Sequence, residues 1–228
     1  LQLIRLIEFK RLLMSILHIM YQSNKMLVDP NYMPAKNTYS VGATSASGYR
    51  RAKSIIKLIN TVAERINNDR RVNDRLHVVF VENYRVSVAE KIFPAADVSE
   101  QISTAGLEAS GTSNMKFMVN GALTMGTMDG ANIEIVEEAG KENAFIFGLL
   151  TDEILKIERD HSYNPQEYLE RNPGLAKVVE QLVDGTYDPT HQLFKELHDS
   201  LVYGVEGNRA DVYYVLADFD SYCKAQDE

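Results

Sequence analysis

His77-Val78-Val79-Phe80-Val81 is the clearest strand signal in this chain. A strand with one solvent-exposed face alternates apolar and polar residues, whereas a strand covered on both faces has a continuous run of apolar residues. The run from Val78 to Val81 is continuous. It therefore predicts a parallel strand with helices on both sides.

Strand and helix patterns alternate on the N-terminal side of this run. Residues 1–6 and 38–41 read as short strands, while apolar residues recur at helical spacing over 9–25 and 52–66. The order strand, helix, strand, helix, strand implies right-handed crossovers. The predicted fold class is α/β, with a doubly wound, mostly parallel sheet.

The C-terminal half adds short strands and then helices. Three further strands are expected, and beyond Gly148 the pattern becomes helical. An aromatic-rich last segment is expected to pack inward rather than to bind a ligand. The strands are predicted at 123–126, 133–136 and 144–147, and the helices at 151–159, 165–171, 175–182, 193–201 and 211–225.

Composition excludes several classes of protein. Of 228 residues, 45% are hydrophobic and 25% are charged, as in ordinary globular domains. A net charge of -8 argues against nucleic-acid or anionic-membrane surfaces, and no apolar run is long enough to span a bilayer. Cys223 is the single cysteine and the histidines show no metal spacing, so a cytoplasmic protein without structural metal is expected. The start within a strand pattern, without methionine, suggests a piece of a longer chain.

A loop of mostly small and polar residues runs from Gln101 to Ser113 and leads into a helix-compatible segment, 115–119. Uncovered backbone N–H groups at a helix start bind phosphates and sugars. Ligands of doubly wound sheets bind beyond the carboxyl ends of the strands. Residues 5–10, 42–48, 82–86 and this loop are therefore expected to meet at one crevice. An ordinary capping loop is the alternative.

The charged residues of these segments suit a phosphate and a hydroxylated ligand. They are three cations, Arg5, Lys10 and Arg85, and one carboxylate, Glu108; solvated surface charge is the alternative. Lys116 lies inside an apolar segment, where a lysine either extends to solvent or forms a Schiff base with an aldehyde cofactor such as pyridoxal phosphate. The residues alone leave both explanations open.

The motif Glu108-Ala109-Ser110-Gly111-Thr112-Ser113-Asn114-Met115-Lys116 resembles the cofactor-attachment signature of the α-glucan phosphorylases, which act on glycogen, starch or maltodextrin. The resemblance continues in Glu82-Asn83-Tyr84-Arg85-Val86-Ser87 and in Gly126-Thr127-Met128-Asp129-Gly130-Ala131-Asn132. Nearly the whole chain resembles the C-terminal domain of such an enzyme. Residues 1–150 would be part of its Rossmann-like cofactor-binding domain, and 151–228 a helical part packed on the same domain.

The resemblance implies pyridoxal 5′-phosphate as the cofactor. Lys116 would hold it through a Schiff base, with Tyr84 and Arg85 at its border. The backbone N–H groups of Thr112 and Ser113 would take its 5′-phosphate. Clustered cations around a phosphate stabilise the charge that develops there.

The resemblance also implies the substrate contacts. Arg5 would bind substrate phosphate, and Lys10 would neutralise the cofactor phosphate; with Lys116 these are the expected catalytic residues. The residues expected to hold glucosyl hydroxyls are Glu108, Ala109, Ser110 and Gly111.

The family reaction is the reversible phosphorolysis of a terminal α-1,4-linked glucose. Its partners are an α-1,4-glucan, inorganic phosphate and α-glucose 1-phosphate. A homodimer and an N-terminal domain that completes the site are implied for the full-length protein. The 228 residues alone are therefore expected to show no phosphorolysis.

The first residues depart from the family pattern. Ile4, Ile7 and Phe9 stand where lysine, histidine and tyrosine are usual, and Thr44 and Ser47 where lysine and proline are usual. One lost charge-assisted hydrogen bond costs about 1.5–3 kcal/mol. A pyridoxal-phosphate or glucan-binding module with weakened catalysis is therefore the alternative. A nucleotide-sugar glycosyltransferase is disfavoured, because such enzymes need no Schiff-base lysine.

Overall fold

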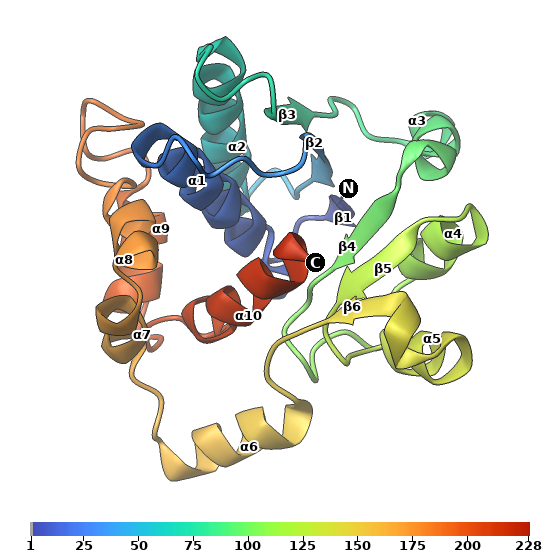
Figure 1. Cartoon of the computed structure of the whole chain (residues 1–228). Helices are drawn as coiled ribbons and strands as arrows, with labels where there is room; N and C mark the ends of the chain where they lie inside the picture. Colours follow the sequence, from blue (N-terminus) through green and yellow to red (C-terminus); the bar gives the residue numbers. More distant parts are fainter. Residues whose placement is uncertain (1) are drawn as a thin grey trace.

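The computed structural model describes residues 2–228, apart from the side chains of residues 3–5, and shows two parallel three-stranded sheets (Figure 1). The first contains β1 (Gln2–Arg5), β2 (Asn37–Thr44) and β3 (Leu76–Phe80), and the second β4 (Val98–Gln101), β5 (Leu123–Gly126) and β6 (Ala144–Ile146). The edge strands β1 and β4 lie side by side in Figure 1. The α/β fold class is confirmed.

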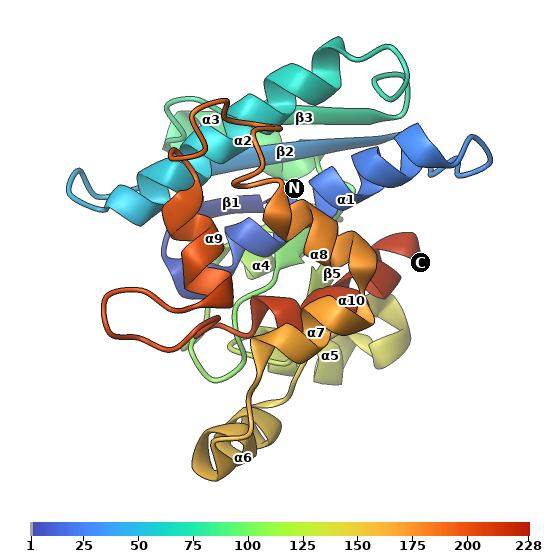
Figure 2. The same ribbon diagram turned by 90° about the vertical axis from the view of Figure 1, so that its left-hand side faces the viewer.

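Helices flank both sheets. The first sheet carries α1 (Leu12–Val28) and α2 (Arg50–Asn68), and the second α3 (Val86–Ile92), α4 (Ser113–Val119) and α5 (Asn132–Ala139) (Figure 1). The remaining helices are α6 (Thr151–Asp160), α7 (Pro165–Arg171), α8 (Pro173–Glu180), α9 (Lys195–Val202) and α10 (Val215–Asp227), and the short 3₁₀ turns are η1 (Glu8–Lys10), η2 (Phe93–Ala95) and η3 (Lys141–Asn143). Figure 2 shows α6 projecting from the body of the molecule.

Helix α2 illustrates how the pattern becomes structure. Its buried residues recur every three or four positions, from Ala52 and Ile55 to Val62 and Ile66, so one stripe faces the sheet. Each fully buried aliphatic side chain of this kind contributes about 1.5–3 kcal/mol. Asn67 fixes the far end of the helix, because its side chain bonds both the carbonyl oxygen and the N–H of Val78 on β3, at 2.8 and 3.0 Å.

The strand predicted at 133–136 is wrong, because these residues belong to α5. The run Ile133-Glu134-Ile135-Val136 is too short for its apolar pattern to distinguish strand from helix. Asn132 and Val136, one helical turn apart, are buried, and Glu134 lies in the first turn, where the helix dipole favours an acid. Packing on the second sheet therefore selects the helix.

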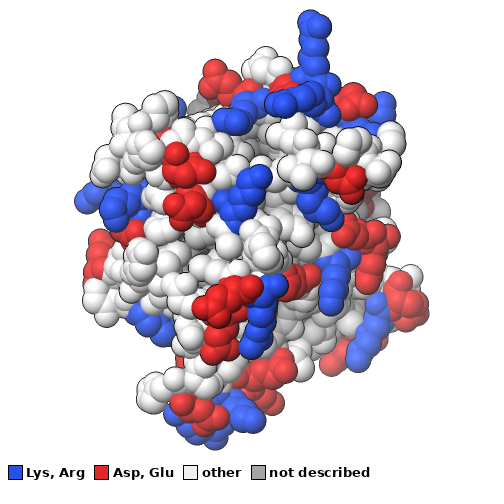
Figure 3. All heavy atoms as spheres, turned by 60° about the vertical axis from the view of Figure 1, so that its left-hand side comes forward, with Lys and Arg blue, Asp and Glu red and all other residues white. Residues whose placement is uncertain are grey.

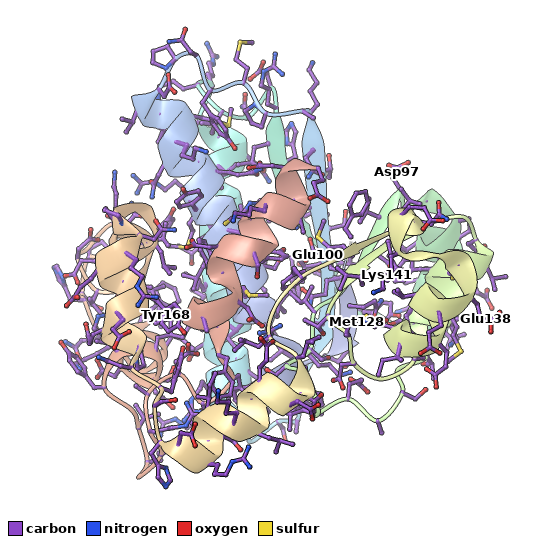
Figure 4. All side chains as sticks on the ribbon, turned by 60° about the horizontal axis from the view of Figure 1, so that its bottom comes forward. Asp97, Glu100, Met128, Glu138, Lys141 and Tyr168 are labelled. Carbon is purple, nitrogen blue, oxygen red and sulfur yellow. The ribbon has the colours of Figure 1, made fainter. Side chains whose placement is uncertain are left out.

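Strand β4 was not predicted, because its sequence is polar. Ser99 and Glu100 are nevertheless buried in the second sheet. The Glu100 carboxylate lies next to α10 (Figure 4), where Tyr222 Oη and Gln226 Nε2 each donate to it at 2.9 Å. These bonds replace the water that the strand loses, which makes a buried polar strand tolerable.

The main core joins both sheets to the C-terminal helices. Phe219 and Tyr222 of α10 are fully buried in it, which confirms that the aromatic segment packs inward. On the face shown in Figure 3, acidic and basic side chains are interspersed rather than gathered into one patch. No helix among residues 2–228 is both long and apolar enough to cross a membrane.

Candidate functional site

A pocket of about 400 Å³ lies beyond the carboxyl ends of β4 and β5. Its volume is within the usual range for small-molecule sites. It opens where β4 passes into the loop 102–112, which leads to α4, and where β5 passes into residues 127–131, which lead to α5. The lining residues are Lys10, Tyr84, Phe93, Gln101, Ser103, Glu108, Ser110, Gly111, Thr112, Ser113, Asn114, Lys116, Thr127, Asp129 and Asn132.

The segment Thr127–Asn132, here called the clamp segment, holds the loop 102–112 in place. Its residue Met128 is labelled at the β5–α5 connection in Figure 4. Thr127 Oγ1 donates to the carbonyl oxygen of Ser103 at 2.6 Å, and the N–H of Ala131 donates to that of Ser110 at 2.7 Å. The loop is thus bonded near both ends by a second loop that follows the neighbouring strand.

Two further side chains of the clamp segment complete this attachment. Asp129 accepts the N–H of Gly106 at 2.9 Å on one carboxylate oxygen and that of Glu108 at 2.8 Å on the other. Asn132 donates to the carbonyl oxygen of Gln101 at 3.1 Å and accepts from the Asn114 side chain at 3.0 Å.

Gly130 lets the two loops approach each other closely. A Cβ atom there would lie 2.5 Å from the carbonyl oxygen of Ser110, and the residue has a φ of 54°. Both observations favour glycine, which has no Cβ and adopts positive φ at no steric cost. The loop 102–112 therefore has little freedom at this point.

The backbone of this loop presents unused donors. None of the N–H groups of residues 109–114 donates a hydrogen bond to any atom of the described chain, 2–228. Gly111, Thr112, Ser113 and Asn114 line the pocket. Gly111, with a φ of 81°, places the turn just before α4. Such consecutive free N–H groups suit phosphate oxygens and sugar hydroxyls.

Lys10 and Glu108 form an ion pair across the pocket. Each side chain is 21% exposed, and the Ser103 hydroxyl lies 3.4 Å from the same carboxylate. The Lys10 ammonium also lies 5.5 Å from the ring centre of Phe9. The pair thus links the turn after β1 to the loop after β4.

Lys116 lies on α4 and also lines the pocket. Among residues 2–228 its ammonium has no carboxylate or hydrogen-bond partner, and it lies 5.9 Å from the ring centre of Phe93. An apolar hollow adjoins it, formed in part by Pro94 and Val119. Lys116 is therefore free to bind a ligand that has an apolar ring.

Tyr84 is half-buried in the pocket wall. Burial raises the pKa of its phenol, so the hydroxyl remains protonated at neutral pH. It can donate a hydrogen bond to a ligand or accept one.

Arg11 stabilises the start of the loop 102–112 that lines the pocket. Its side chain is fully buried and pairs with Asp218 of α10 at 2.6 Å. The guanidinium also donates to the carbonyl oxygens of Ile102 at 2.7 Å and Ser103 at 3.4 Å, at the start of the loop. Because Arg11 follows Lys10 directly, one buried network holds Lys10 and the base of the loop.

The structure brings most of the expected site residues together. Eight of them line the pocket: Lys10, Tyr84, Glu108, Ser110, Gly111, Thr112, Ser113 and Lys116. Ala109 and Arg85 are not among the lining residues, and the Arg85 side chain donates to Ser87 at 3.1 Å. The side chain of Arg5 lies outside the described part of the structure. Residues 42–48 do not line this pocket, contrary to the expected convergence.

Several pocket residues had no predicted role. Asp129 and Asn132 lie in a motif that carried the resemblance, yet nothing in that motif indicated which atoms they would hold. A useful signal was the Asp-Gly turn directly after an expected strand, since loops that follow parallel strands meet at the ligand edge. Among residues 2–228, no group of three His, Cys, Asp or Glu residues could hold a metal ion.

The fold and pocket define an α/β protein whose pocket, beyond the carboxyl ends of two parallel strands, is lined by Lys10, Lys116 and a loop with free backbone N–H groups among the described residues. The carbohydrate phosphorylase family model matches residues 1–228. The chain therefore belongs to the carbohydrate phosphorylase family, which confirms the resemblance.

Curated relatives agree with this membership. The chain is 49% identical over 228 residues to the muscle form of glycogen phosphorylase from Mus musculus. It is 48% identical to both the muscle and the liver form from Homo sapiens. Each match covers all of this chain but only 26% of the relative, so the chain spans about a quarter of these proteins.

Proposed function

We propose that this pocket binds pyridoxal 5′-phosphate and, in a full-length protein, takes part in phosphorolysis of terminal α-1,4-linked glucose from a glucan. The product would be α-glucose 1-phosphate. The observation that carries the proposal is the row of N–H groups at residues 109–114 that have no acceptor in the described part of the chain, in the same pocket as Lys116, whose ammonium contacts the Phe93 ring and has no carboxylate partner among the described residues. A phosphate needs several donors, and an aldehyde needs an accessible amine.

The residues present fit the cofactor. Lys116 would attach it, Tyr84 and Phe93 would border its ring, and the N–H groups of Thr112 and Ser113 would take its phosphate. Arg85 would lie further out. When bound, this cofactor supplies a phosphate group that takes part in proton transfer.

The other residues would bind and orient the substrates. Glu108 and the backbone of 109–111 would hold glucosyl hydroxyls, which fixes the position of the sugar. Lys10 would stabilise phosphate charge with Arg5, in a pocket where partial burial strengthens electrostatic attraction. Arg5, Lys10 and Lys116 remain the proposed catalytic residues.

The proposal for catalysis concerns a longer protein. Because the chain spans 26% of its relatives, the remaining substrate contacts and a homodimer interface would come from the rest of such a protein. We expect the 228 residues alone to bind cofactor without phosphorolysis. The division at residue 150 into a cofactor-binding and a helical part, and a cytoplasmic location, stay predictions.

One observation favours weakened catalysis as an alternative. Phe9, under the Lys10 ammonium, has no hydroxyl to offer a substrate, where the family pattern has a tyrosine. The alternative is then a module that binds pyridoxal phosphate or glucan but turns over slowly. Joining this chain to the N-terminal part of a glycogen phosphorylase relative and measuring glucose 1-phosphate formation separates the two.

Cofactor attachment is tested on the chain itself. Pyridoxal 5′-phosphate is titrated in, the absorbance of the bound form is followed, and the adduct is reduced with borohydride and located by mass spectrometry. We expect one adduct, on Lys116, that Lys116→Ala abolishes. Lys141→Ala is the matched control, because Lys141 is an exposed lysine of the same half of the molecule (Figure 4). An undiminished adduct in Lys116→Ala would refute the assignment.

A further inference from the structure

Asp129 is a buried carboxylate in the pocket, 6% exposed. Among the side chains that the structure describes, which exclude that of Arg5, no lysine, arginine or histidine forms an ion pair with it. Its two oxygens are instead occupied by the N–H groups of Gly106 and Glu108. A carboxylate held only by backbone donors acts on the conformation of that backbone.

Because of these two bonds, some N–H groups of the loop donate to Asp129 while others remain available to a ligand. The N–H groups of positions 106 and 108 point at Asp129, whereas those of 109–114 have no acceptor in the described chain. Leu107, between the two anchored residues, is exposed. Gly106 has a φ of 87°, so the chain turns at the first anchor. The second anchor immediately precedes the row of free donors.

We propose that Asp129 is the positioning residue of this pocket: by holding the N–H groups of Gly106 and Glu108, it directs the N–H groups of residues 109–114 and the Glu108 side chain toward the ligand. This inference rests on the proposed function, because the ligand is taken to be pyridoxal 5′-phosphate. Asp129 does not touch the reacting atoms. It acts through the loop.

Other contacts of the clamp segment cannot replace this role. Thr127 and Ala131 donate to carbonyl oxygens of the loop, and Asn132 donates to that of Gln101. Asp129 is thus the residue of the clamp segment that accepts N–H groups from the loop. Carboxylate acceptors are stronger than neutral ones. An amide of the same shape has one acceptor oxygen, and its NH₂ group would face the second N–H.

The test compares Asp129→Asn with a matched variant, Asp188→Asn. Asp188 is also buried and does not line the pocket. Its carboxylate also accepts backbone N–H groups, those of Thr190 at 3.1 Å, Gln192 at 2.9 Å and Leu193 at 2.7 Å, and in addition the Thr190 hydroxyl. Both variants remove a carboxylate that orders a loop. Only Asp129 orders the loop that lines the pocket.

Two measurements are made on the wild-type chain and on each variant. The first is the affinity for pyridoxal 5′-phosphate, by absorbance titration. The second is hydrogen exchange of residues 102–114 with and without this ligand. We expect Asp129→Asn to bind at least about tenfold more weakly, as for one lost charge-assisted hydrogen bond. The ligand should slow exchange at 109–114 in wild type and in Asp188→Asn, but not in Asp129→Asn.

The outcomes separate this inference from the proposed function. Equal affinity and equal ligand protection in wild type and Asp129→Asn overturn the positioning role while the proposed function stands. Absence of binding to the wild-type chain overturns both. If Asp129→Asn does not fold, Asp129→Glu replaces it, because it keeps two acceptor oxygens but lengthens the side chain by one methylene. Weaker binding than wild type supports positioning, and unchanged affinity contradicts it.

Discussion

Replacing Asp218 with asparagine should destabilise the chain strongly, because it breaks a buried ion pair. Asp218 is 2% exposed at its side chain and Arg11 is 0% exposed. Removing one partner of such a pair leaves an uncompensated charge and costs about 3–5 kcal/mol. The Arg11 guanidinium keeps its 2.7 Å bond to the carbonyl oxygen of Ile102, so we expect the lower end of this range. Asp218 also accepts the N–H of Leu149 at 2.8 Å.

Urea unfolding measures this cost. A loss of about 3 kcal/mol is a large part of a typical total of about 5–15 kcal/mol, and with a usual slope it moves the midpoint by about 1 M or more. Glu167→Gln is the control, since Glu167 and Arg171 form an exposed pair, 51% and 69% exposed. Exposed pairs contribute about 0–1 kcal/mol. A cost for Asp218→Asn no larger than that of the control would refute the reasoning.

A double substitution gives a second check on the same pair. Replacing Arg11 with methionine and Asp218 with leucine removes both charges, so no unpaired ion remains. Buried pairs replaced by apolar residues of similar size are often neutral or stabilised. The double variant should therefore be more stable than Asp218→Asn alone. A double variant as unstable as the single one would show that the cost arises from lost packing or from the hydrogen bonds to Ile102 and Leu149, rather than from an unpaired charge.

Two further predictions concern single residues, Gly130 and His18. Gly130→Ala should lower stability by at least about 1 kcal/mol and weaken pyridoxal 5′-phosphate binding, because its Cβ would lie 2.5 Å from the Ser110 carbonyl oxygen; unchanged unfolding midpoint and affinity would contradict this. Burial lowers the pKa of His18 from 6.5 to about 3, so below pH 6.5 the unfolded chain binds a proton that the folded chain does not. The free energy of unfolding should therefore fall by up to about 1.4 kcal/mol for each pH unit by which the pH is lowered from 6.5 toward 3. His18→Phe should reduce this pH dependence in urea unfolding; the same pH dependence in the variant and in wild type would contradict the prediction.

Local patterns predicted the elements that carry a strong apolar signal. A strand forms at Leu76–Phe80 and the periodic stripe of α2 is buried, because burial of apolar area dominates their energetics. The prediction that this strand is covered on both faces is wrong: β3 lies at the edge of its sheet, its buried and exposed residues alternate, and Val79 is 45% exposed. Strand β4 has no such signal, since Ser99 and Glu100 are polar and become buried only in the folded sheet, where Tyr222 donates to the Glu100 carboxylate. Residues 133–136 had an ambiguous pattern, and the packing of Val136 resolved it as helix.

The candidate site was predicted in part. Lys10, Glu108 and Lys116 were identified from residue type, motif and strand order, and the structure places all three around one pocket. Asp129 was not identified, although it lies only 21 positions beyond Glu108. The sequence does not distinguish an aspartate whose carboxylate accepts backbone N–H groups from the aspartate of any other Asp-Gly turn. Its function depends on which backbone lies opposite.

The sequence by itself determines the local features of this chain. These are the positions of the helices and of most strands, the small residues that leave backbone N–H groups uncovered, and the lysine that follows them. The tertiary structure alone determined that Thr127–Asn132 clamps the loop, that Arg11 and Asp218 support it from below, and that Lys10 pairs with Glu108. The physical reason is distance along the chain. Hydrogen bonds and ion pairs between residues far apart in sequence depend on how strands are ordered and packed, and no local periodicity specifies those partners.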